Sequence, residues 1–264
     1  MTPTFWKLRH AKLKVDKFQF PNNDKECHNS NRTASAAERL LQNDNIFTEQ
    51  QMKEHRGTFI AGGYDTTAQT TANCLLLLAM HPGVQDKVVE EIFQLFPSDD
   101  DNLINFNSLN ELKYLEQVIQ ETLRVAPTIP FFPREPAEDF EIKPGCVIPK
   151  GTVMVFNTFV LHRRKDIWGL DADKFNPDHF LPENLATKHP YSYIPFSSGK
   201  RNCIGLKYAK ISLKIILMKC LRTFKFHTKL HYDDIKFKGE VTLRLSGQHL
   251  VHVEDRNPTC LQSL

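Results

Sequence analysis

The sequence predicts a mainly α-helical fold with a small antiparallel β region. Hydrophobic residues recur at helical spacing in four segments, residues 48–80, 82–96, 108–124 and 204–223. Short strand-like segments alternate with turn residues between positions 139 and 156, and again between 241 and 253. Helices should therefore form most of the structure and short strands a minor part.

Composition is that of a globular protein. The chain has 264 residues, 41% hydrophobic and 25% charged, enough for one large domain or two small ones. A net charge of +3 is too small to indicate a nucleic-acid partner. The six cysteines are scattered without a CxxC pair or a zinc-like cluster, so five are expected to be structural or free thiols in a reducing compartment.

The first 47 residues are expected to form an irregular segment, followed by a domain over residues 48–264. Residues 1–20 are basic but lack the continuous apolar stretch of a signal peptide. No apolar run approaches the ~18–20 residues needed to cross a membrane, so no membrane anchor is expected in this chain.

The first long helix is expected to begin at a capping box, Thr48-Glu-Gln-Gln51, and to end before Pro82. Gly62 and Gly63 lie inside it, and each costs roughly 1 kcal/mol relative to alanine. Such a pair marks a bend or a place where something approaches the backbone. The next polar residues, Asp65, Thr66 and Thr67, fit either an ordinary kinked helix or a proton relay built from an acid and hydroxyls.

A second capping box, Ser108-Leu-Asn-Glu111, predicts the start of the helix that ends near Arg124. Glu121 and Arg124 share one face of this helix. On a protein surface such a pair contributes under ~1 kcal/mol, so by itself it is a weak signal.

Three prolines between residues 125 and 133 predict an extended, rigid segment, which is followed by Arg134. Alternating short strands and turns then predict a small antiparallel sheet over residues 139–156. Residues 157–164 are expected to be helical and residues 168–190 irregular.

Residues 196–205 (FSSGKRNCIG) place Cys203 on a glycine-flanked loop that runs into a helix. Gly199 allows a turn that a side chain would hinder, and Gly205 allows a large flat group to approach. Free N–H groups and the dipole at a helix start stabilise a thiolate, as does the positive charge of Arg201. Phe196 offers an apolar cover against water. Most single cysteines are small core residues, but this surrounding favours a thiolate metal ligand.

The helix over residues 204–223 carries three lysines, Lys207, Lys210 and Lys214, that are expected to share one exposed face. With Lys200 they would form a small basic patch. The patch fits an ordinary solvated face or a docking surface for an acidic electron-donor protein.

The spacing Phe-x-x-Gly-x-Arg-x-Cys-x-Gly fixes five positions, which chance produces on the order of 10⁻⁷ times per start position. It resembles the haem-ligand loop of the cytochrome P450 superfamily, the haem-thiolate monooxygenases. The segment Gly63-x-Asp65-Thr66-Thr67 resembles the family's distal-helix signature, and Glu121-x-x-Arg124 a second family motif. These motifs occur in the family's order, and the sequence is most similar to animal microsomal members.

The resemblance implies the C-terminal half of the cytochrome P450 fold, with heme b (iron protoporphyrin IX) as cofactor. It implies that Cys203 is the metal ligand, that Phe196, Gly199 and Gly205 shape the haem-binding loop, and that Arg134 and Arg201 hold the haem propionates. Asp65 and Thr66 would be catalytic, delivering protons to bound oxygen.

Glu121 and Arg124 would form a structural pair completed by a third residue from a Pro-x-Arg-Phe segment. The matching stretch here is Pro177-Asp-His-Phe180, so His179 stands where arginine is expected. A neutral imidazole cannot replace a permanently charged fork. The core is therefore expected to be weakened, or His179 to be protonated.

The implied reaction inserts one oxygen atom from O₂ into a small apolar substrate. The implied partner is NADPH-cytochrome P450 reductase, with cytochrome b5 as a further electron donor, on the cytoplasmic face of the endoplasmic reticulum. Roughly the first half of the family's domain has no counterpart in this sequence. Two rival hypotheses therefore stay open: a catalytically silent chain that does not bind haem, and a haem-binding protein that is not an oxygenase.

Overall fold

The computed structural model describes residues 48–98 and 104–256. The irregular segment expected over residues 1–47 lies outside this part of the chain. Contacts divide the chain into two units, Met1–Arg56 and Gly57–Leu264. In the first unit, the predicted capping box is confirmed: the Gln51 amide donates to Thr48 Oγ1 (3.2 Å), and the Thr48 amide donates to Gln51 Oε1 (2.8 Å).

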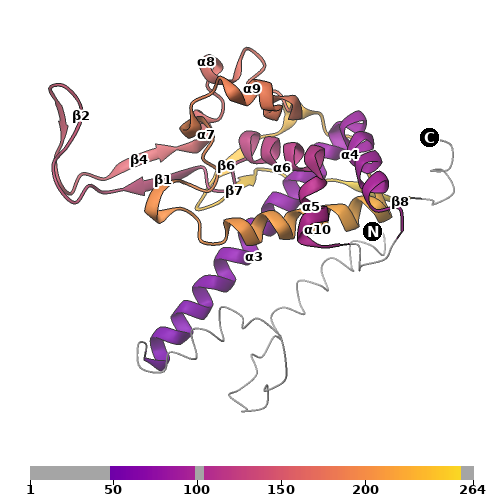
Figure 1. The fold of residues 1–264 in the computed structure, drawn as a ribbon, viewed down its shortest axis with the longest axis horizontal. Coiled ribbons are helices and arrows are strands. Elements are labelled where there is room, and N and C mark those ends of the chain that lie inside the picture. The colour runs from indigo at the N-terminus through magenta and orange to yellow at the C-terminus, as the bar shows by residue number, and fades with distance from the viewer. Residues whose placement is uncertain (1–47, 99–103, 257–264) are drawn as a thin grey trace. The chain divides into compact units, whose positions relative to one another are not determined.

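The structure is mainly helical, as predicted (Figure 1). The long helices are α3 (Glu49–Met80), α4 (Pro82–Leu95), α6 (Lys113–Val125) and α10 (Leu206–Thr223). Four shorter helices are α5 (Phe106–Glu111), α7 (Thr158–Leu161), α8 (Lys165–Trp168) and α9 (Pro182–Ala186). The 3₁₀ turns are η2 (Pro177–Phe180), η3 (Pro190–Ser192), η4 (Gly199–Arg201) and η5 (Tyr232–Asp234).

The prediction of a single helix over residues 108–124 is wrong, because two helices cover this part of the chain. The capping residue is Asn105, whose side chain accepts from the amides of Asn107 and Ser108 at 3.0 Å each. Ser108 is therefore the third residue of α5, and the chain turns at Leu112 before α6 begins. Glu91 of α4 accepts the first free amides of α6, so the second helix start is satisfied by a side chain remote in sequence.

The strands form four two-stranded antiparallel sheets rather than one. The first pairs β1 (Phe131–Arg134) with β4 (Met154–Asn157), and the second pairs β2 (Phe140–Lys143) with β3 (Cys146–Ile148). The third pairs β5 (Phe224–His227) with β8 (His252–Asp255), and the fourth pairs β6 (Phe237–Gly239) with β7 (Leu243–Leu245). Residues 157–164, expected to be helical throughout, contain only the short helix α7.

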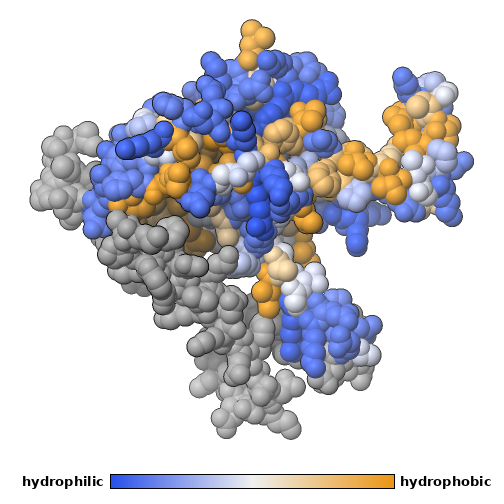
Figure 2. All heavy atoms as spheres, turned by 180° about the vertical axis from the view of Figure 1, so that it is seen from behind, coloured by the Kyte–Doolittle hydropathy of each residue, from blue (hydrophilic) through white to orange (hydrophobic). Residues whose placement is uncertain are grey.

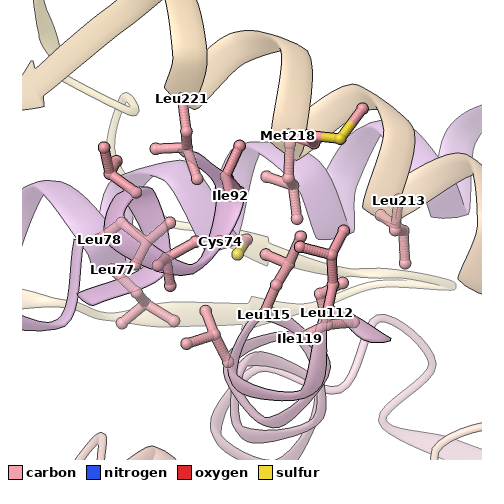
Figure 3. Packing of buried hydrophobic residues seen from close by; sticks show 14 of the residues in the cluster. Cys74, Leu77, Leu78, Ile92, Leu112, Leu115, Ile119, Leu213, Met218 and Leu221 are labelled. Carbon is pink, nitrogen blue, oxygen red and sulfur yellow. The ribbon is translucent and has the colours of Figure 1, made fainter. Parts of the chain in front are cut away.

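The main hydrophobic core lies where α3, α4, α6 and α10 meet (Figure 3). Leu78, Ile92, Leu115 and Leu217, one from each helix, are fully shielded from solvent. Cys74 is buried among them, and burial raises the pKa of its thiol to about 12. Cys74 is therefore a small core residue without accessible chemistry.

Apolar side chains also reach the surface, and two of these places bear on the candidate site and the sheets. On α3, Phe59, Ile60 and Tyr64 are each nearly half exposed. The second place is the ribbon of β1 and β4, which continues into the β2–β3 hairpin (Figure 1) and carries orange apolar surface in Figure 2. Its exposed apolar residues are Phe131, Phe140, Ile142, Val147, Val153, Val155 and Phe156. None of the helices in residues 48–98 and 104–256 is both long and apolar enough to cross a membrane.

Candidate functional site

The Cys203 loop has the geometry expected of a ligand loop. Gly199 adopts φ +78°, the left-handed conformation that glycine permits. The Cys203 amide donates to the Phe196 carbonyl (3.0 Å), which closes the loop, and Gly205 is the residue that caps α10. Cys203 is exposed, so its sulfur is available to a ligand.

Gly205 lies next to the sulfur of Cys203. A Cβ at this position would lie 3.8 Å from Cys203 Sγ, which is an ordinary van der Waals contact. At Gly199 a side chain would meet open space, so glycine is required there by the backbone angle alone. The backbone angle thus accounts for Gly199, whereas the approach of a large flat group at Gly205 stays a prediction.

Arg134 reaches this loop from strand β1. Its Nη2 donates to Ser197 Oγ (2.6 Å) and to the Arg201 carbonyl (3.3 Å), and its guanidinium lies 4.7 Å from the ring centroid of Phe132. Ser197 has φ +61°, a conformation uncommon outside glycine. The contact therefore secures a strained point of the loop and ties Arg134 to the backbone two residues before Cys203.

The residues present fit a haem. An exposed thiol at the start of a helix supplies a soft ligand for iron. Two arginines beside it suit carboxylate groups such as propionates, since guanidinium pairs with carboxylates in a bidentate manner. Within the described part of the chain, no cluster of three or more His, Cys, Asp or Glu residues could hold a metal ion.

Asp65 and Thr66 lie on α3, which continues as one helix through Gly62 and Gly63. The Thr66 hydroxyl donates to the Gly62 carbonyl (2.6 Å). Asp65 lies 3.4 Å from Arg244 Nη2 and 3.4 Å from Thr242 Oγ1, contacts that the sequence did not indicate. Among the described residues, no hydrogen bond or ion pair joins Asp65 or Thr66 to the Cys203 loop.

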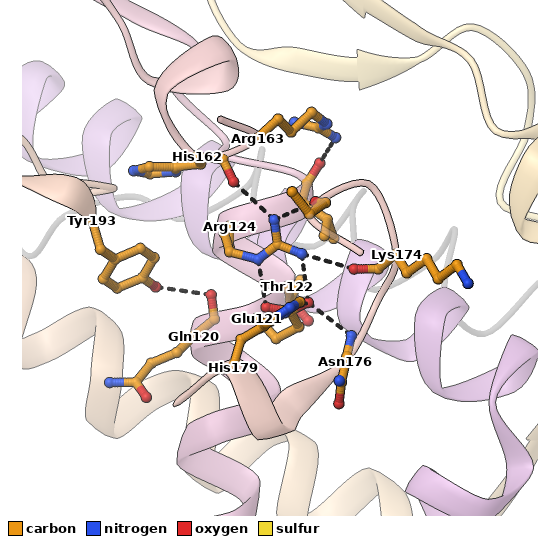
Figure 4. A network of polar contacts seen from close by, with 12 residues as sticks. Gln120, Glu121, Thr122, Arg124, His162, Arg163, Lys174, Asn176, His179 and Tyr193 are labelled. Atoms are coloured by element: carbon orange, nitrogen blue, oxygen red, sulfur yellow. Dashed lines mark hydrogen bonds and ion pairs between the residues drawn. The ribbon is translucent and has the colours of Figure 1, made fainter. Parts of the chain in front are cut away.

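The Glu121–Arg124 pair is fully buried and bidentate (Figure 4). Arg124 Nε donates to Glu121 Oε2 and Nη2 to Oε1, both at 2.7 Å. The remaining donors of Arg124 bind the carbonyls of His162 (2.8 Å), Ala172 (2.5 Å) and Lys174 (2.7 Å). This arginine therefore fastens the irregular segment that leads to the Cys203 loop onto helix α6.

His179 joins the same network from η2, which packs against α6. Its Nδ1 lies 3.1 Å from Glu121 Oε1 and its Nε2 lies 3.3 Å from Asp171 Oδ1. Burial lowers the pKa of His179, but hydrogen bonding and charge attraction to Glu121, together with Asp171, outweigh burial and raise it above the ordinary value. Asp171 was missed from the sequence because it lies outside every motif.

His162 and Tyr193 connect this network to the loop itself, and neither was indicated by the sequence. The Ile194 amide donates to His162 Nε2 (3.0 Å), and the Tyr193 hydroxyl donates to the Gln120 carbonyl (2.9 Å). Burial, with the nearby charge of Arg124, lowers the pKa of His162 to about 3. His162 is therefore a neutral acceptor that positions the chain just before Phe196.

The prediction that Lys207, Lys210 and Lys214 share one exposed face of α10 is wrong. Lys214 is buried and lies 3.0 Å from Glu116 Oε2, while Lys210 lies 2.8 Å from Glu116 Oε1. Lys214 also donates to the Leu109 carbonyl. Two of the three lysines thus fasten α10 to α5 and α6, and Lys207 alone of the three is exposed.

Comparison with known proteins agrees with this geometry. The family model for cytochrome P450 matches residues 6–251. Probable cytochrome P450 313a1 of Drosophila melanogaster is 44% identical over 217 residues, covering 82% of this chain and 44% of the relative. Cytochrome P450 4c3 of the same species is 37% identical over 199 residues, covering 75% of this chain and 37% of the relative. The chain belongs to the cytochrome P450 family.

A solved structure supports the same assignment. The crystal structure of a cytochrome P450DA mutant heme domain has a TM-score of 0.71 and 28% identity, and the match covers 81% of this chain and 45% of that one. The chain spans less than half the length of these relatives. The predicted fold class, mainly α with small antiparallel sheets as in part of a cytochrome P450, is confirmed.

Proposed function

We propose that this chain is part of a haem-thiolate monooxygenase that inserts one oxygen atom from O₂ into a small apolar substrate. Substrate classes with this chemistry include lipids, hormones and xenobiotics. The observation that carries the proposal is the exposed thiol of Cys203, held at the start of α10 by the loop bond to the Phe196 carbonyl. Membership of the cytochrome P450 family supports it.

In this proposal, Cys203 binds the iron of heme b through its thiolate. Arg134 and Arg201 bind the two propionates, and Phe196 limits the access of water to the sulfur. Gly199 permits the turn of the loop, and Gly205 leaves room beside the sulfur. The bound haem supplies oxygen activation, which no side chain can perform alone.

Asp65 and Thr66 are proposed to hold and pass protons. The Thr66 hydroxyl donates to the Gly62 carbonyl, so its lone pairs remain available to accept a hydrogen bond from a proton donor. Asp65 is half exposed and can exchange protons with solvent. Arg244 and Thr242 restrain its carboxylate from the C-terminal strand region.

The proposed electron donor is NADPH-cytochrome P450 reductase, with cytochrome b5 as a further donor. The proposed location is the cytoplasmic face of the endoplasmic reticulum. Both rest on kinship with animal relatives such as cytochrome P450 4c3. The exposed Phe59, Ile60 and Tyr64 on α3 support a preference for apolar molecules near Asp65.

A second candidate is a chain that does not bind haem. The exposed apolar residues Phe59, Ile60 and Tyr64 on α3 are compatible with it, because an apolar surface of this kind need not serve a haem pocket. A haem-binding protein that is not an oxygenase is a third possibility, and the presence of both Asp65 and Thr66 argues against it.

The proposal is tested by titrating haem into the purified chain and by adding reductase and NADPH. Cys203→Ala should abolish stoichiometric binding, whereas Cys146→Ala, which removes a half-buried thiol on β3, should not. No binding by the unaltered chain would favour the haem-free candidate. Binding without reductase-dependent product formation would favour the non-oxygenase.

A further inference from the structure

The imidazole of His179 lies between two carboxylates. Nδ1 is 3.1 Å from Glu121 Oε1, and Nε2 is 3.3 Å from Asp171 Oδ1. The first contact is a hydrogen bond, whereas the second lies within ion-pair distance without hydrogen-bond alignment. The ring is buried, and the edge of the ring of Trp168 packs near it with centroids 6.0 Å apart.

Glu121 can act only as an acceptor here. Its two oxygens accept hydrogen bonds from Nε and Nη2 of Arg124, and Oε1 also accepts one from the amide of Asn176 at 2.8 Å. A carboxylate that accepts from a buried guanidinium is ionised. Nδ1 of His179 must therefore carry a hydrogen.

Asp171 imposes the same requirement on the other nitrogen. Its side chain is 44% exposed, and although its partial burial opposes ionisation, its contacts with His179 and Asn176 lower the pKa of the carboxyl. An unprotonated Nε2 would leave a nitrogen with a partial negative charge 3.3 Å from a charged oxygen. Both nitrogens therefore require a hydrogen, which only the imidazolium form provides.

We propose that His179 is held as an imidazolium between Glu121 and Asp171, and that it is a positioning residue whose protonation secures the segment leading to Cys203. It acts through Arg124, since both cations share Glu121. Loss of the proton leaves Asp171 3.3 Å from an uncharged nitrogen and removes one of the two cations that neutralise the carboxylates.

A chain of hydrogen bonds leads from His179 towards the loop, and Figure 4 shows its first members, Glu121, Arg124 and His162. Arg124 binds the carbonyls of Ala172 and Lys174, so this part of the segment is held on α6. It also binds the His162 carbonyl, and the ring of His162 accepts from the Ile194 amide. Ile194 lies two residues before Phe196, where the Cys203 loop starts.

The charged groups that face His179 come from two elements. Helix α6 contributes Glu121 and Arg124, and the turn after α8 contributes Asp171. Helix α9 packs on η2 and carries Glu183, but no ion pair in residues 104–256 joins Glu183 to His179. The attraction of Glu121 and Asp171 exceeds the repulsion of Arg124 and the cost of burial, which agrees with the raised pKa of His179.

The sign of the pH effect follows. Because the folded-state pKa of His179 is raised above 6.5, the stabilisation is complete below pH 6.5 and is lost as pH rises through the folded pKa. His162 acts in the opposite direction and at lower pH, since its pKa is about 3. A window from pH 6.5 to 8.5 therefore isolates His179 from His162.

The first test is the titration of the His179 ring protons by NMR in the full chain, assigned by comparison with His179→Gln. We expect a midpoint above 6.5, and a midpoint at or below 6.5 would overturn the proposal. The measurement needs no haem, so its failure is separate from failure of the proposed function.

The second test is hydrogen exchange of the segment over residues 171–196 between pH 6.5 and 8.5, expressed as protection relative to an unstructured chain. We expect protection to fall with rising pH in the unaltered chain and to stay constant in His179→Arg, which keeps a permanent cation. His252→Gln, which removes a mostly exposed ring, should behave like the unaltered chain. An equal fall in His179→Arg would overturn the proposal even if His179→Gln does not fold.

Discussion

Arg134 donates to the hydroxyl of Ser197 over 2.6 Å, a contact between residues 63 positions apart. It joins strand β1 to the one non-glycine residue with positive φ in the described part of the chain. The same nitrogen binds the Arg201 carbonyl, so a single guanidinium holds both sides of the turn before Cys203.

Arg134→Ala should weaken haem binding about tenfold, because a charge-assisted contact of ~1.5 kcal/mol is lost together with one cation. Haem affinity is measured by titration and by transfer to apomyoglobin. Lys200→Ala removes an exposed positive charge from the same loop without removing the Ser197 contact. Equal affinity loss in the two variants would contradict a specific role for Arg134.

Arg124→Lys should destabilise the fold by about 3–5 kcal/mol, since it leaves Glu121 and three carbonyls without their fork of donors in a buried site. Urea unfolding of the chain measures the loss. The matched control is Arg164→Lys, because Arg164 pairs with Asp166 at the surface and should change stability little. A similar small change at Arg124 would show that the buried pair is not a structural anchor.

Thr66→Ala should leave haem binding and stability nearly unchanged but lower the yield of product per NADPH consumed. The Thr66 hydroxyl bonds only one turn back, to Gly62, so the helix loses little. Thr71 makes the same type of bond to Thr67 on the same helix, and Thr71→Ala is therefore the control. Asp65→Asn should likewise uncouple electron use from product. Full coupling in both Thr66→Ala and Asp65→Asn would remove these residues from the proton path.

Lys214→Ala should destabilise the chain by about 2 kcal/mol, because Glu116 and the Leu109 carbonyl lose a buried partner. Thermal unfolding of Lys214→Ala and of Lys207→Ala, on the exposed side of α10, separates this effect from helix propensity. Equal unfolding temperatures would mean that the contacts of Lys214 do not support the fold.

Acid should weaken the fold through His162. The pKa of His162 falls from 6.5 to about 3 on folding. The neutral ring therefore stabilises the folded chain fully above pH 6.5, and this stabilisation is lost as the pH falls from 6.5 towards 3. Between pH 6.5 and 4.5 the loss should be about 2–3 kcal/mol at 1.36 kcal/mol per pH unit. His162→Asn, whose Oδ1 can accept from Ile194, should show a smaller dependence in urea unfolding over the same range. An unchanged dependence would mean that other groups cause the acid sensitivity.

Much of the fold follows from local signals. The reciprocal bonds of Thr48 and Gln51, the stop at Pro82 and the start of α10 beyond Gly205 all depend on neighbours within a few residues. The break at Leu112 does not, because the amides at the start of α6 are bound by Glu91, which lies more than 20 residues earlier. A capping box pattern alone could not distinguish Ser108 as a cap from Ser108 as the third helical residue.

The candidate site divides in the same way. The loop around Cys203 was predicted because its residue types and spacing are contiguous. The partners Ser197, Asp171 and Arg244 were not, since each meets its partner only after the chain folds. Lys214 was expected at the surface because helical periodicity gives the face of a residue but not the carboxylate that Glu116 brings to it.

The most direct test of the account is the carbon monoxide difference spectrum of the dithionite-reduced chain after addition of haem. We expect the red-shifted band typical of thiolate-ligated haem in the unaltered chain and in Cys146→Ala, and no such band in Cys203→Ala. A spectrum without this band in the unaltered chain, or the same band in Cys203→Ala, would contradict the assignment of Cys203 as the haem ligand.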